Sequence, residues 1–229
     1  MKVISFYTEG GGSSYEREAE ILRASLERFG IPHYIVPVKA WGDWYDHTAF
    51  KALFIAEMRE REAGPLLWID TDAIVHEDIA PYFNRLARDG YDFGAHYFAG
   101  PAKGYRLAEV RAEGWRLLSG TTFWGDTDKA RSLLRAWVGL NGVLQGEKVR
   151  QGGGQKNLWY LTTCFLKEGL RVARLPGRYC YVFDKPFGYP ENEPRIIEHT
   201  IASRDHRAKR RETPGRKARI EELLEGGQG

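Results

Sequence analysis

The chain has 229 residues, of which 42% are hydrophobic and 28% charged, with a formal net charge of +3, and this suits one α/β domain with a real core. Its only cysteines, Cys164 and Cys180, form no Cys-x-x-Cys or Cys/His pattern, which excludes a disulfide scaffold and a cysteine zinc site and favours a reducing compartment. With no signal peptide and no apolar run near the roughly 20 residues of a membrane span, we expect a soluble cytoplasmic protein.

The first half of the chain alternates strand-like and helix-like patterns. We expect strands at residues 3–7, 33–38, 65–69 and 91–96, helices at about 14–29, 48–63 and 81–88, a glycine turn at 10–12 and a loop at 41–45. The first helix has a capping box of Ser13 with Glu16, an apolar stripe that includes Leu22 and Leu26, and Gly30 at its end. This alternation predicts a parallel sheet that is covered on both faces and binds ligands beyond the carboxyl ends of its strands.

The second half is less regular. We expect one or two strands at residues 115–124, helices at 127–140 and 155–167, and strands at 171–175, 179–183 and 195–198. The end of the chain is basic, because residues 204–219 carry eight Lys and Arg against two acidic residues, a net +6 that leaves −3 for the remainder. The predicted division is a folded domain at 1–203 and a basic, partly disordered tail at 204–229. In that tail Ile220, Leu223 and Leu224 favour a short amphipathic helix.

Two aspartates follow a short buried strand. The apolar run from Pro65 to Ile69 ends at Asp70, and Asp72 stands one residue further on. Because side chains alternate along a strand, the two carboxylates are expected to point the same way, roughly 6–7 Å apart at the backbone. Such a pair needs a shared proton, a basic neighbour or a cation. No Lys or Arg is near in sequence, so we favour a hard divalent cation, of the kind that serves a phosphate-bearing substrate.

Three kinds of protein place an Asp-x-Asp pair after a buried strand: a metal-dependent sugar-nucleotide transferase, a phosphatase with an aspartate nucleophile, and a protein in which the pair only caps a turn. The phosphatase pattern starts near the amino terminus and continues Asp-x-Asp-Gly-Thr, whereas here the strand is the third and Ala73–Val75 follows. A different class, a nucleic-acid-binding module, would use the basic tail to contact phosphates.

Three motifs resemble the GT-A glycosyltransferases in their order and spacing. They are Leu66–Val75 with Lys51 in the helix before it, Leu118–Trp124, and Gln155–Leu158. The resemblance covers roughly residues 1–200 and is to the small retaining enzymes of the glycogenin and lipopolysaccharide-galactosyltransferase group. It implies a single GT-A domain, Rossmann-like with a mixed central sheet. It also implies transfer of a sugar from a nucleotide-diphosphate sugar, with UDP favoured over GDP, in the presence of Mn²⁺ or Mg²⁺.

The resemblance implies a role for several residues of this chain. Asp70 would touch the ribose and the metal, Asp72 would bind the metal more fully, and His199 would complete the metal site, with His76 as its local competitor. The residues expected at the donor are Lys51 on the diphosphate, Thr8 and Tyr15 on the nucleotide, and Ser119, Gly120 and Gln155 on the sugar. Asp70, Asp72 and Gln155 form the expected catalytic set.

Other features leave alternatives open. Gly154 stands where many members of the family carry Asp, and Asp126 either reaches the active centre or, as we favour, caps the next helix. The acceptor is open between a glycan, a lipid-linked glycan and DNA reached through the basic tail. Retention of configuration is implied by the resemblance alone.

Overall fold

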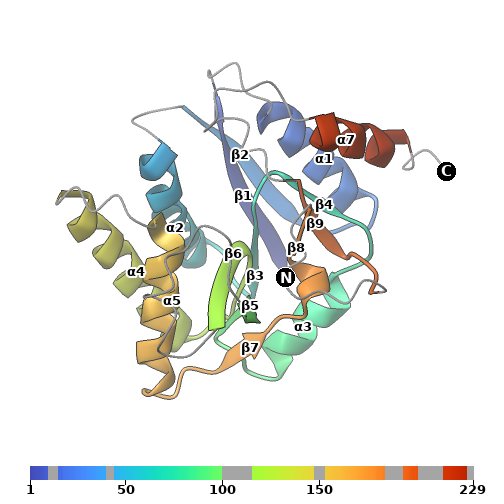
Figure 1. Cartoon of the computed structure of the whole chain (residues 1–229). Coiled ribbons are helices and arrows are strands. Elements are labelled where there is room, and N and C mark those ends of the chain that lie inside the picture. Colours follow the sequence, from blue (N-terminus) through green and yellow to red (C-terminus); the bar gives the residue numbers. More distant parts are fainter. Residues whose placement is uncertain are drawn as a thin grey trace.

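The computed structural model of the chain describes residues 1–9, 15–39, 44–99, 115–146, 153–183, 193–200 and 214–225. Its centre is a six-stranded sheet (Figure 1). In order across the sheet the strands are β2 (His33–Lys39), β1 (Lys2–Glu9), β3 (Leu66–Ile69), β6 (Trp115–Trp124), β5 (Phe93–Ala99) and β7 (Val172–Arg174). A second, three-stranded sheet has the order β4 (Ala73–Val75), β9 (Ile197–His199) and β8 (Tyr181–Val182).

The central sheet is mixed. Strand β1 is parallel to β2 and β3, and β5 is parallel to β7, but β6 runs antiparallel to both of its neighbours, β3 and β5. The expectation of an all-parallel sheet from strand and helix alternation is therefore wrong, whereas the mixed sheet implied by the family resemblance is confirmed. Alternation predicts direction only where a helix connects two strands, and the apolar pattern of β6 carries no information about its direction.

Helices cover both faces of the central sheet. The described helices are α1 (Tyr15–Glu27), α2 (Trp44–Arg61), α3 (Ala80–Arg88), α4 (Asp128–Gly146), α5 (Gly153–Leu166) and α7 (Pro214–Glu225), and a 3₁₀ turn lies at Gly177–Tyr179. In Figure 1, α2, α4 and α5 lie together on one side of the sheet, and α1 and α3 lie on the other side with the small sheet. In the described part of the chain, no helix combines the length and the apolar character that crossing a membrane requires.

Side-chain alternation in β3 separates two hydrophobic cores. Leu66 and Trp68 pack among residues of α2, α4 and α5, while Leu67 and Ile69 pack among residues of α1, α3 and the small sheet. All four side chains are at most 2% exposed, and burial of each contributes roughly 1.5–3 kcal/mol. Strand β3 is thus fixed from both faces, which gives the residues that follow it a rigid base.

Most predicted elements are present with shifted ends. Helix α1 ends before Gly30, whose φ of +62° is a conformation that glycine adopts without strain. Helix α2 begins at Trp44, so Trp44 and Tyr45 belong to a helix where a loop was expected. The glycine turn at 10–12, Ser13 of the expected capping box and residues 41–43 lie outside the described residues.

The carboxyl-terminal helix packs onto the domain. Helix α7 contains the predicted amphipathic segment, and Ile220 is only 1% exposed. The basic residues 204–213 lie outside the described part of the chain. The division into a domain at 1–203 and a tail at 204–229 stays a prediction.

Candidate active site

The two aspartates lie in a turn that joins the two sheets. Strand β3 ends at Ile69, a turn follows at Thr71 and Asp72, and the next strand, β4, belongs to the small sheet. The backbone N–H of Asp70 donates to the carbonyl of Gly120 on β6 at 2.8 Å. The expectation that Asp70 and Asp72 share one face of a strand is wrong, because the strand stops before them and each carboxylate has its own partner.

Asp70 is paired with a lysine. Lys51 Nζ, from α2, donates to Asp70 Oδ1 at 2.6 Å, and the indole Nε1 of Trp68 donates to the same oxygen at 2.7 Å. Lys51 Nζ also lies 3.3 Å from the carbonyl oxygen of Ser119 and 5.0 Å from the centroid of the Trp68 ring. A basic neighbour, one of the three compensations considered from the sequence, is therefore present, and it was missed because it comes 19 positions earlier on another element.

Asp72 is paired with His199. Its Oδ1 lies 3.7 Å from His199 Nδ1, and the backbone N–H of Thr200 donates to the Asp72 carbonyl at 2.8 Å. His199 Nε2 and Thr121 Oγ1 are hydrogen bonded at 2.9 Å. Burial lowers the pKa of His199, but Asp72 and the Cys180 thiol outweigh burial and raise it to about 10. The imidazole is therefore held in one orientation by contacts to both of its nitrogens.

Gly120 makes room for this imidazole. A Cβ atom at position 120 would lie 2.9 Å from His199 Cε1 and 3.1 Å from His199 Nε2, closer than side-chain carbons normally approach. The ring thus packs directly on the β6 backbone. A glycine in the motif Ser119-Gly120-Thr121 has a local structural reason here, which is the close approach of His199.

Gln155 orients the strand next to that glycine. Its Oε1 accepts hydrogen bonds from the backbone N–H and from the hydroxyl of Ser119, each at 3.1 Å. The preceding residue, Gly154, lies where helices pack tightly: a Cβ there would be 3.1 Å from the carbonyl oxygen of Thr48 and 3.3 Å from the Trp137 ring. A side chain at position 154 would require these neighbours to move by a few tenths of an ångström.

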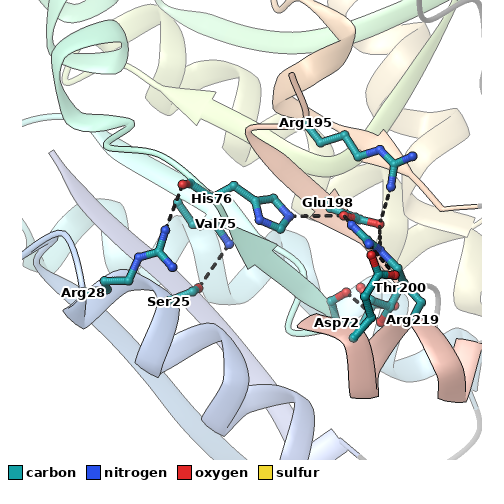
Figure 2. A network of polar contacts seen from close by, with 10 residues as sticks. Ser25, Arg28, Asp72, Val75, His76, Arg195, Glu198, Thr200 and Arg219 are labelled. Atoms are coloured by element: carbon teal, nitrogen blue, oxygen red, sulfur yellow. Dashed lines mark hydrogen bonds and ion pairs between the residues drawn. The ribbon is translucent and has the colours of Figure 1, made fainter. Parts of the chain in front are cut away.

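The remaining candidates lie in different places. Thr8 is near the end of β1 and Tyr15 is the first residue of α1, and their expected nucleotide-binding roles stay predictions. His76 is not beside the aspartates: its Nε2 lies 3.2 Å from Glu198 Oε2, as Figure 2 shows. Asp126 lies at the opposite end of β3, where its carboxylate accepts a hydrogen bond from the backbone N–H of Gly64.

The capping role expected for Asp126 is wrong. The N–H of Ala130 in the first turn of α4 donates to Thr127 Oγ1 at 3.1 Å, so Thr127 is the capping residue. Asp126 instead forms ion pairs with Arg131 at 2.6 Å and with the buried Arg59 at 3.7 Å. It supports the amino end of β3 and does not take part in the cluster at the carboxyl end.

The ligand atoms at this site have the chemistry that a divalent metal requires. Carboxylate oxygens and an imidazole nitrogen are ligands for Mn²⁺, and Asp72 Oδ1 and His199 Nδ1 are near enough to share one ion. Asp70 has one oxygen committed to Lys51 and Trp68. Among the described residues, no three His, Cys, Asp or Glu side chains are grouped so that they could hold a metal. Asp72 and His199 therefore supply two ligands, and metal binding requires His199 to lose the proton that its raised pKa retains near neutral pH.

Sequence reasoning missed three contributors to the cluster. Trp68 stands only two residues before Asp70, and its indole N–H reaches that carboxylate, so its nearness in sequence was a usable signal. Thr121 and Cys180 reach His199 only through the fold, and nothing in their sequence surroundings indicates this contact.

Solved structures resemble this chain over most of its length. A glycosyltransferase involved in the glycosylation of the major capsid of PBCV-1 superposes with a TM-score of 0.63 at 13% identity, over 91% of this chain and 98% of that one. Mouse xyloside xylosyltransferase 1, in its apo form, gives 0.55 at 10% identity, over 87% and 97% of the two chains. The galactosyltransferase LgtC, solved with donor and acceptor sugar analogues, gives 0.51 at 12% identity, over 87% and 86%.

No protein-family model and no curated protein matches the sequence. At identities of 10–13% the structural likeness establishes the fold and does not transfer an activity. The chain is an α/β protein with a mixed central sheet and has the fold of the GT-A glycosyltransferases.

Proposed function

We propose that this protein is a metal-dependent glycosyltransferase that moves a sugar from a nucleotide-diphosphate donor to an acceptor. The observation that carries the proposal is the convergence of Lys51, Asp70, Asp72, Ser119, Gly120, Gln155 and His199 at the carboxyl end of β3 on this fold. In open α/β sheets, ligands bind beyond the carboxyl ends of the strands. These seven residues come from α2, the β3–β4 turn, β6, α5 and β9, so only the folded chain brings them together.

Departure of the nucleotide is the step that needs positive charge. As the bond to the sugar breaks, the diphosphate gains negative charge, and a cation in a site of restricted solvent access stabilises it. Within the described part of the chain, Lys51 supplies a cation at this site, with a side chain only 12% exposed. In the absence of donor, Lys51 neutralises the charge of Asp70. With donor bound, its ammonium group can stabilise the negative charge of the diphosphate.

The other residues hold the donor in position. Asp72 and His199, with Asp70, would hold the divalent ion, which would supply Lewis-acid stabilisation of the negative charge on the departing diphosphate. Gln155 fixes the Ser119 hydroxyl and backbone, so a sugar placed against β6 meets a preorganised polar surface. Trp68 orients the Asp70 carboxylate through its indole N–H.

The phosphatase alternative is less well supported. The solved structures that resemble the chain are glycosyltransferases, and the Asp-x-Asp pair follows the third strand of the chain and not a strand at the amino terminus, as the phosphatase pattern requires. The basic tail that a nucleic-acid-binding module would use lies mostly outside the described residues.

The acceptor and the cellular setting remain proposals. The structural neighbours are named for a viral capsid and for a xyloside, so their names do not agree on one acceptor. Both cysteines are free thiols, and Cys180 is buried against His199, which supports a cytoplasmic setting.

A thermal-shift panel of UDP- and GDP-sugars, with and without Mn²⁺, tests the proposal. A ligand at about 100 times its Kd stabilises the native state by roughly 2.7 kcal/mol, which raises the Tm by several degrees for a chain of this size. We expect a shift that needs both Mn²⁺ and one nucleotide sugar. No shift with any donor would refute the proposal.

The Asp72→Asn variant makes the test specific. It should lose the Mn²⁺-dependent shift and the slow hydrolysis of the donor, because an amide is a poor ligand in place of a carboxylate. Asp89→Asn is the matched control, since Asp89 is exposed at the end of α3. Undiminished hydrolysis by Asp72→Asn would remove Asp72 from the mechanism.

A further inference from the structure

Strand β9 carries a buried carboxylate with an unusual number of basic partners. Glu198 is completely buried, and Figure 2 shows its side chain among Arg219, Arg195 and His76. Arg219 Nε and Nη2 donate to its two oxygens at 2.9 and 2.6 Å, Arg195 Nη1 lies at 3.4 Å and His76 Nε2 at 3.2 Å. Burial raises the pKa of Glu198, but these partners outweigh burial and lower it to about 2.

Arg219 is the dominant partner. Its two hydrogen bonds form a fork on the carboxylate, a geometry that fixes direction as well as distance. Its side chain is 15% exposed, whereas that of Arg195 is 41% exposed and makes one long contact. Arg219 belongs to α7, which is anchored next to it by Ile220, only 1% exposed. The carboxyl-terminal helix is therefore tied to β9 through one buried carboxylate.

Strand β9 is also the element that presents His199. Glu198 and His199 are consecutive, so they project from opposite faces of the strand. His199 pairs with Ala73 of β4, and the N–H of Thr200 donates to the Asp72 carbonyl at 2.8 Å. A displacement of β9 at Glu198 would therefore move His199 relative to Asp72 on the other face.

We propose that α7 contributes to the candidate site through Arg219, which acts as a positioning residue. Arg219 binds Glu198 and thereby fixes β9, and β9 holds His199 against Asp72. The expected consequence is that the affinities for donor and metal depend on a residue of the carboxyl-terminal helix. This consequence rests on the proposed function. The ion pairs of Arg219 go to Glu198 and Glu222, so its proposed effect on His199 passes through Glu198.

The first test observes His199 directly in the ligand-free full-length protein. The ring nitrogens of the six histidines are followed by ¹H–¹⁵N NMR, and His199→Gln assigns the signal of interest. In Arg219→Gln we expect the His199 signals to shift or broaden. In Arg219→Lys, which keeps the charge but loses the fork, the change should be smaller.

Two matched controls separate positioning from general loss of stability. Arg131→Gln breaks another partly buried ion pair, at 2.6 Å, at the far end of β3. Glu222→Gln removes the exposed second partner of Arg219 on the same helix. Unchanged His199 signals in Arg219→Gln, or an equal change in Arg131→Gln, would overturn the inference.

The second test measures Mn²⁺ affinity by electron paramagnetic resonance of the free ion. Loss of a residue that orients a ligand typically weakens metal affinity about 10–100-fold, and we expect this for Arg219→Gln but not for the two controls. If wild type binds neither Mn²⁺ nor any nucleotide sugar, the proposed function fails while the NMR result still decides the positioning role. If wild type binds Mn²⁺ and Arg219→Gln binds it equally, the positioning role fails alone.

Discussion

Substitution of Gly120 by alanine tests the packing on which the candidate site depends. The added Cβ would lie 2.9 Å from His199 Cε1 and 3.2 Å from Nδ1. The backbone at Gly120 is not in the left-handed region, so alanine is tolerated there and the effect comes from the imidazole alone. The ring can yield only by breaking its contact with Thr121 or Asp72.

The expected magnitude follows from two opposing terms. Overpacking of a well-packed site costs about 1–3 kcal/mol, and replacing glycine by alanine stabilises by about 0.4–1 kcal/mol through the unfolded chain. We therefore expect Gly120→Ala to lower the free energy of unfolding by roughly 1–2 kcal/mol. We also expect it to weaken Mn²⁺-dependent donor binding, since His199 is displaced from Asp72.

Urea unfolding of four variants, Gly120→Ala, Gly139→Ala, His199→Ala and the double variant of Gly120 and His199, isolates the cause. Gly139→Ala is the control, because Gly139 lies in α4 with open space around it and alanine there should stabilise by about 0.5–1 kcal/mol. In a His199→Ala background the clash is gone, so Gly120→Ala should cost less than in wild type by the whole overpacking term, about 1–3 kcal/mol. An identical cost in both backgrounds would show that the imidazole is not the obstacle.

Three further predictions concern Lys51, His96 and helix α7. Lys51→Met should raise the KM for the donor by about tenfold, or ~1.4 kcal/mol, with little effect on the Tm because Asp70 is 37% exposed; an unchanged KM in initial-rate measurements would exclude Lys51 from donor binding. Burial lowers the pKa of His96 below 6.5, so stability falls as pH drops below that value, and His96→Gln should flatten the slope of unfolding free energy between about pH 7 and 5; equal slopes would contradict this. Deletion of residues 214–229 leaves Glu198 without its main partner and should cost about 3–5 kcal/mol, measured as a lower Tm; a wild-type Tm would show that α7 adds no stability.

Local patterns in the sequence predicted the elements well where burial of one face decides the structure. The helix at residues 15–27 follows from the spacing of Leu22 and Leu26, which are both fully buried, and from the glycine after it. The strand at 66–69 follows from four consecutive apolar residues, all of them buried. In these segments local preference and tertiary packing agree.

Strand direction and helix starts were less predictable. The run at residues 115–124 forms one strand, but its antiparallel direction depends on neighbours far away in the sequence. Helix α2 begins at Trp44, four residues before the expected start, because intrinsic preferences of a few tenths of a kcal/mol do not fix where a helix begins.

The site was predictable in part. The family resemblance pointed to Lys51, Ser119, Gln155 and His199, and the structure brings these side chains near the two aspartates, while their roles stay predictions. The pairing of Lys51 with Asp70 was not foreseen, because the two residues are 19 positions apart and meet only when α2 packs on the sheet. The fork of Arg219 on Glu198 likewise depends on where α7 docks.

The crossing of the chain from one sheet to the other at Asp70–Asp72 has a consequence for how the protein is made. The Asp72 carbonyl accepts a hydrogen bond from Thr200, 128 positions further along the chain. Such distant contacts form late in folding because loop closure costs entropy. A chain still emerging from the ribosome can build β1, β2 and β3 but has no complete site until residue 200 has been synthesised. Assembly of the candidate site should therefore follow the assembly of much of the hydrophobic interior.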